Sequence, residues 1–112
     1  MAFAVEGSRL LWRRPFDAAR AAREAGEEWD NAASPASAFN HALLSGGEAE
    51  GAALPGLVPP LLVIHGSRDP LLPPARAKRL AATVPGSRLL WLDGAGHEIH
   101  PDDWPAIIAA VS

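Results

Sequence analysis

A continuous apolar run opens the second half of the sequence, Leu61-Leu62-Val63-Ile64-His65, between Pro59-Pro60 and Gly66. A run of this length, bounded by proline and glycine, is typical of a strand that is covered on both faces, as in a parallel sheet. A second run, Leu89-Leu90-Trp91-Leu92, is closed by Asp93-Gly94 and predicts a second strand of the same kind.

A helical pattern follows each of these runs. After the first run, apolar residues recur at i, i+3, i+4 and i+7 and the pattern ends at Pro85-Gly86; these residues are Ala77, Leu80, Ala81 and Val84. The same spacing recurs near the C-terminus, at Trp104, Ile107, Ile108 and Val111. The order strand, helix, strand, helix predicts an α/β unit with parallel strands and a right-handed crossover. The expected core is Leu62, Ile64, Leu90, Leu92, Ile107 and Ile108.

The residues before this unit predict two helices and a linker. Pro15 suits the first turn of one helix, and Ser34-Pro35 supplies the N-cap and first position of another, which Gly46-Gly47 ends. Residues 48–60 are rich in glycine, alanine and proline. We therefore expect a helical segment over 1–47, a linker over 48–60 and the α/β unit over 61–112.

Two loops follow the two predicted strands and carry polar residues of chemical interest. Asp69 lies in the first loop and His97, 28 positions later, in the second. Ligands and chemistry in open α/β sheets lie beyond the carboxyl ends of the strands, so neighbouring parallel strands would bring this acid and this histidine together. A carboxylate beside an imidazole fixes its tautomer and stabilises the imidazolium that forms when the ring takes a proton.

The two loops resemble the C-terminal section of an α/β-hydrolase, in which a catalytic triad runs Ser, Asp or Glu, then His along the chain. The resemblance rests on Leu61–Pro70 and on Gly94-Ala95-Gly96-His97-Glu98, and it covers residues 59–111. It implies that Asp69 is the triad acid and His97 the triad base. The first half, including Ser34–His41, is similar to the helical lid of such enzymes, and within the family the chain is similar to small esterases such as aclacinomycin methylesterase-like hydrolases. A small-molecule ester is the implied substrate.

The nucleophile elbow G-x-S-x-G of that family is absent. Ser8 has Glu6 and Leu10 where glycines belong, and Ser45 has Leu43 on one side. Complete enzymes of this type are roughly twice as long or more. The sequence therefore predicts a truncated or split hydrolase that is inactive alone. Two alternatives remain: a non-catalytic remnant or interaction module, or half of an enzyme completed by an upstream polypeptide that supplies the serine and the rest of the sheet. The expected macromolecular partner is that upstream polypeptide or a second copy of the chain.

Composition excludes several other classes of protein. The net charge of −3 argues against a nucleic-acid binder, which needs a basic face. The absence of cysteine excludes thiol nucleophiles and thiolate metal sites. The apolar runs are too short to cross a bilayer, and Met1–Glu6 lacks the pattern of a secretory signal, so a cytoplasmic protein without membrane contact is expected.

The remaining histidines carry weaker expectations. His65 is expected to be structural at the strand end, and His100 to cap the last helix before Pro101. The stretch His97-Glu98-Ile99-His100 is not the H-E-x-x-H motif of zinc enzymes. We therefore expect neither a metal nor a cofactor.

Overall fold

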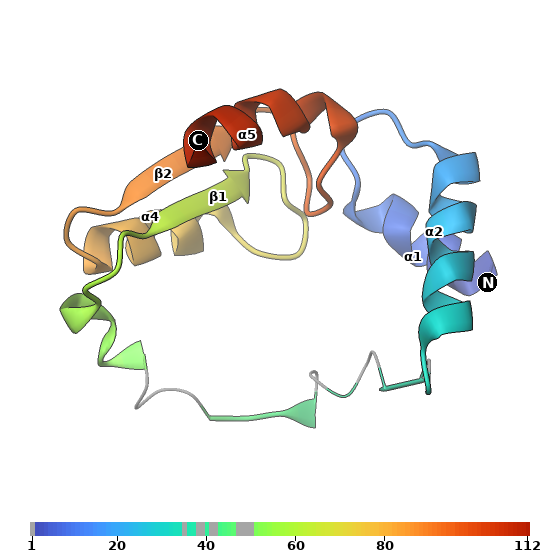
Figure 1. Ribbon diagram of the computed structural model, residues 1–112, viewed down its shortest axis with the longest axis horizontal. Helices are drawn as coiled ribbons and strands as arrows, with labels where there is room; N and C mark the ends of the chain where they lie inside the picture. Colours follow the sequence, from blue (N-terminus) through green and yellow to red (C-terminus); the bar gives the residue numbers. More distant parts are fainter. Residues whose placement is uncertain (1, 35, 38–39, 41–42, 47–50) are drawn as a thin grey trace.

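The computed structural model describes the chain except for residues 1, 35, 38–39, 41–42 and 47–50. Its elements are the helices and strands of Figure 1 and two short 3₁₀ turns, η2 and η3. In chain order they are α1 (Ala2–Leu11), α2 (Ala18–Asn31), η2 (Leu54–Gly56), β1 (Leu62–Gly66), α4 (Pro74–Thr83), β2 (Arg88–Leu92), η3 (Pro101–Asp103) and α5 (Trp104–Val111).

The two strands form the parallel pair that the sequence predicts. Leu62 lies opposite Arg88 and Gly66 opposite Leu92, so both strands end at the same edge. Helix α4 connects them and packs on both, while α5 contacts β2. In the view of Figure 1, α4 lies below the strands and α5 above them. The loops that follow β1 and β2 consequently leave the sheet side by side.

The core is smaller than the sequence predicts. Its buried apolar residues around the sheet are mostly small: Val63, Ala77, Val84, Leu92 and Ala95. The prediction is wrong for Ile64, which is 37% exposed, and for Ile108, which is 60% exposed. Within the described residues the sheet has only two strands, which cover one stripe of each neighbouring helix and leave one edge of β1 without a partner, so apolar residues on both kinds of element stay exposed.

The helical segment differs from its prediction over α1 and at the start of α2. Helix α1 was not predicted, since it has no acidic residue in its first turn and carries Gly7 in its middle. The helix predicted from Pro15 begins at Ala18, because Asp17 caps it by accepting the N–H of Arg20 at 2.9 Å. The helix predicted from Ser34-Pro35 falls largely outside the described residues. None of the described helices has the length and apolar composition needed to span a membrane.

Candidate active site

Backbone hydrogen bonds hold the loops after β1 and β2 against each other. The N–H of Ser67 donates to the carbonyl of Leu92 at 3.1 Å, and the N–H of Arg68 donates to that of Ala95 at 2.9 Å. The hydroxyl of Ser67 also accepts the N–H of Gly94 at 2.7 Å. The two loops therefore form one bonded unit at the carboxyl end of the sheet.

Gly66 allows this close approach. A Cβ at this position would collide with the carbonyl oxygens of Gly96 and Ala95, so the end of β1 meets the second loop backbone to backbone. Gly94 has a φ of 79°, in the left-handed region that favours glycine, and reverses the chain directly after β2. The glycines thus set the separation of the loops that carry Asp69 and His97.

Asp69 makes hydrogen bonds through both of its carboxylate oxygens. Its side chain is 5% exposed, and its Oδ1 accepts the N–H groups of Leu71 at 2.8 Å and Leu72 at 2.9 Å. Its Oδ2 lies 2.8 Å from Nδ1 of His97. A carboxylate can only accept, so Nδ1 carries the proton and donates it to Asp69. The predicted contact between these two residues is therefore present.

The surroundings of Asp69 lower the pKa of its carboxyl group. Burial acts to raise this pKa, but hydrogen bonds from the N–H of Leu72, from His97 and from the N–H of Leu71 outweigh it. The folded protein therefore favours the ionised carboxylate, which is the form that accepts from His97.

This lowered pKa predicts a loss of stability in acid. The contribution of Asp69 is present in full above its unfolded-state pKa of about 3.8 and is lost as the pH falls through the lower folded-state value. We expect the difference in unfolding free energy between the wild type and Asp69→Asn, measured in urea, to shrink from about pH 5 to about pH 2. Asp93→Asn, at an exposed aspartate of the neighbouring loop, is the matched control. A difference that stays constant over this range would contradict the assignment.

The ring of His97 has one nitrogen held and one free. Its side chain is 33% exposed, and its Nε2 makes no hydrogen bond within the part of the chain that the structure describes. With the proton on Nδ1, Nε2 presents a lone pair at the surface. The buried carboxylate of Asp69 thus sets the orientation of the imidazole ring.

His65 contacts the loop that carries Asp69. Its side chain is 10% exposed, and its Nε2 lies 3.1 Å from the carbonyl of Leu72 and 3.8 Å from Oδ2 of Asp69. A carbonyl only accepts, so Nε2–H is the donor. The ring also meets Trp91 edge-on at 5.8 Å between centroids. These contacts fit the structural role that the sequence predicts.

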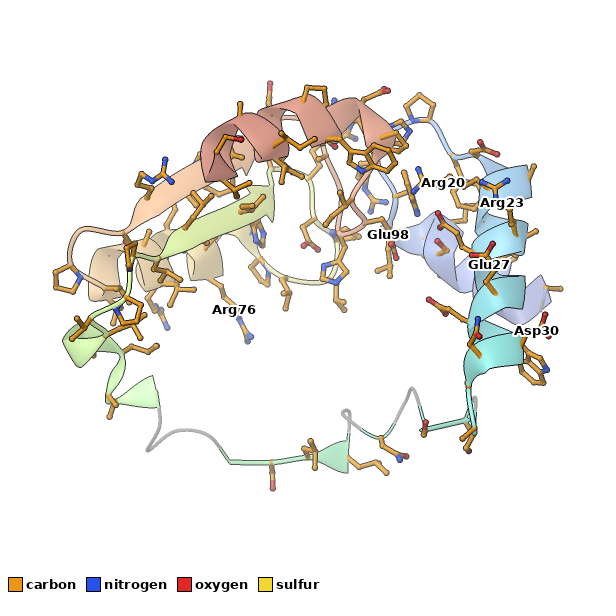
Figure 2. The ribbon with its side chains drawn as sticks, in the orientation of Figure 1. Arg20, Arg23, Glu27, Asp30, Arg76 and Glu98 are labelled. Atoms are coloured by element: carbon orange, nitrogen blue, oxygen red, sulfur yellow. The ribbon has the colours of Figure 1, made fainter. Side chains whose placement is uncertain are left out.

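Glu98 brings a second carboxyl group beside His97. Burial raises its pKa, the positive charge that His97 carries when protonated acts to lower it, and Glu24 and Glu28 of α2 add to the increase. Figure 2 shows Glu98 on the side of its loop that faces α2.

No three histidine, aspartate or glutamate side chains among the described residues are grouped in a way that could hold a metal ion.

Sequence reasoning missed an ion pair that joins the two halves of the chain. Nη2 of Arg14 donates to Oδ1 of Asp103 at 2.6 Å, and the Asp103 side chain is 4% exposed. The bond raises the pKa of Arg14, so the guanidinium is charged. Leaving Asp103 buried without this partner would cost about 3–5 kcal/mol. The two residues are 89 positions apart, and neither belongs to a motif that would predict the contact.

Comparisons with known proteins match the part of the chain that holds these loops. An α/β-hydrolase family model described as TAP-like protein matches residues 27–111, from within α2 to the end of α5. The pimeloyl-(acyl-carrier protein) methyl ester esterase of Aromatoleum aromaticum is 40% identical over 63 residues, which are 54% of this chain and 25% of that protein. The matched region thus spans about a quarter of the length of this curated relative.

Proposed function

The chain belongs to the TAP-like family of α/β-hydrolases, and we propose that it takes part in the hydrolysis of a small carboxylic ester through a Ser-Asp-His triad. Asp69 is the acid of this triad and His97 its base. The observation that supports the proposal best is the 2.8 Å contact between Oδ2 of Asp69 and Nδ1 of His97, with Nε2 left free. The relative from Aromatoleum, named as a methyl ester esterase, supports the choice of an ester bond.

In the proposed reaction, His97 takes up a proton and gives it back twice, once while the acyl-serine forms and once while water hydrolyses it. Its Nε2 takes the proton of the serine hydroxyl while the serine oxygen attacks the ester carbonyl. The ionised Asp69 stabilises the resulting imidazolium. Nε2 then returns the proton to the departing alkoxide as the ester bond breaks, which leaves an acyl-serine. Water repeats the sequence, and the acid product and the free serine are released.

The serine and the oxyanion hole come, in this proposal, from polypeptide outside the 112 residues. The sequence contains no G-x-S-x-G elbow. Within the described residues β1 pairs only with β2, so its other edge is available to a further parallel strand. The exposure of Ile64, on β1, fits a sheet that continues past this edge. The short match to the Aromatoleum esterase points in the same direction.

A chimera tests the proposal directly. The whole chain replaces the homologous section of the Aromatoleum esterase, so that the host supplies its own serine and the rest of its sheet. We expect the chimera to hydrolyse p-nitrophenyl acetate and a methyl ester, whereas the 112-residue chain alone should be no faster than free imidazole. Circular dichroism checks that the chimera is folded. A folded chimera without activity would argue against the proposal and favour a non-catalytic module.

A further inference from the structure

The loop that carries His97 lies directly on the segment that joins α1 to α2. The backbone N–H of His97 donates to the carbonyl oxygen of Leu11 at 2.8 Å. A Cβ at Gly96 would collide with that same oxygen and lie within 3 Å of the N of Arg13. Figure 1 shows the connection between α1 and α2 running beside the turn that precedes α5. The position of His97 is therefore tied to the backbone of residues 11–13.

An ion pair anchors the same segment to the α/β unit. Arg14 bonds to the buried Asp103, and a Cβ at Gly94 would lie 3.3 Å from its Nη1, so the guanidinium covers the start of the His97 loop. Bidentate pairing of an arginine with a carboxylate fixes direction as well as distance, and here both donors, Nε and Nη2, contact Asp103. The anchor lies outside the Asp69–His97 pair and does not depend on it.

His100 fixes the other end of the segment. Its Nδ1 accepts the N–H of Asp102 at 3.0 Å, so the proton is on Nε2, which donates to the carbonyl of Pro15 at 3.2 Å. Its ring also packs edge-on against Trp12 at 5.0 Å between centroids. The sequence predicts that His100 caps the last helix; in the structure it caps η3, the turn that leads into α5, and also binds the segment. Residues 11–15 are thus held at Leu11, Arg14 and Pro15.

From these contacts we propose that Leu11, through its carbonyl, and Arg14, through Asp103, are positioning residues for the base of the proposed triad. The inference rests on the proposed function for its catalytic meaning. The hydrogen bond to Asp69 weakens steeply once its atoms separate beyond about 3.2 Å, so a loop displaced by a fraction of an ångström loses the alignment of His97. The segment joins α1, which ends at Leu11, to α2, which begins at Ala18, so the proposal also makes the position of His97 depend on these two helices.

Gly96→Ala in the full chain tests this inference. The new methyl group displaces the Leu11 carbonyl without removing a charge. We expect hydrogen exchange of the His97 amide to become about tenfold faster relative to the Val84 amide, which bonds to Leu80 within the core. We also expect ¹⁵N NMR of the ring to show loss of the pure Nδ1–H tautomer. Gly56→Ala, where a Cβ meets nothing within 4 Å, is the matched control.

A double variant perturbs the same contact through the Arg14–Asp103 ion pair. Arg14→Met with Asp103→Leu removes the anchor as a pair, which leaves no charge buried alone. Arg88→Met, which removes a bond to the carbonyl of Ala110, is its control. Both readouts at His97 should change in the double variant and stay unchanged in the control. Unchanged exchange and tautomer at His97 in Gly96→Ala and in the double variant would overturn the inference, as would equal changes in the controls. Neither readout requires turnover, so this test and the chimera test can fail separately.

Discussion

Replacing His97 by glutamine in the chimeric esterase is expected to lower kcat by about 10⁶-fold, the scale seen when a triad loses its base. Glutamine can still donate one hydrogen bond toward Oδ2 of Asp69, so the loop keeps much of its packing. It cannot take a proton from serine at neutral pH, because an amide is not a base in this range. The expected loss is therefore in kcat, with little change in KM, and steady-state hydrolysis of a methyl ester measures it.

His65→Gln is the matched control for this loss. The ring of His65 also lies near Asp69, but its Nε2 donates to the carbonyl of Leu72, and a glutamine amide can make the same bond. We expect kcat of this variant to fall by less than about tenfold, which corresponds to the free energy of one hydrogen bond at most. A loss in His65→Gln as large as that in His97→Gln would mean that activity reports the shape of the loop, and His97 would then not be the base.

The sequence predicts the α/β unit well because its signals are local. Apolar runs bounded by proline, glycine and aspartate mark both strands, and the helical spacing at Ala77–Val84 marks the crossover between them. Parallel pairing then follows from the order of the elements. The predicted core is wrong at Ile64 and Ile108 because burial depends on how many strands surround them, which neither residue encodes.

The contact between Asp69 and His97 is also predictable, for a topological reason. Two parallel strands end at one edge, so the residues in their following loops must approach each other. The contacts of Leu11, Arg14 and Asp103 are different, since they join segments far apart in the sequence without any shared periodicity. The role of Gly96 is only partly predictable from the sequence. Small residues before His97 are typical of a tight turn, whereas in the structure the missing side chain of Gly96 makes room for the backbone of Leu11.

Replacing Asp69 by asparagine in the chimera should lower kcat by about 10⁴-fold while leaving the loops in place. The direction follows from the hydrogen bonds of the carboxylate. Oδ1 accepts two backbone N–H groups, from Leu71 and Leu72, so the amide oxygen of asparagine must occupy that position. The amide NH₂ then points at Nδ1 of His97 and donates to it.

This reversal moves the proton of His97 from Nδ1 to Nε2. The nitrogen that should take the serine proton then already carries one, so the base is blocked although the ring has barely moved. NMR of the ring should show the Nε2–H tautomer in Asp69→Asn and the Nδ1–H tautomer in Asp93→Asn, whose exposed aspartate begins the loop that carries His97 and accepts from the hydroxyl of Ser67. If Asp69→Asn kept near-normal kcat with the Nδ1–H tautomer, the carboxylate would be dispensable for orienting His97, and the hydrogen bond would be only a structural tie between the loops.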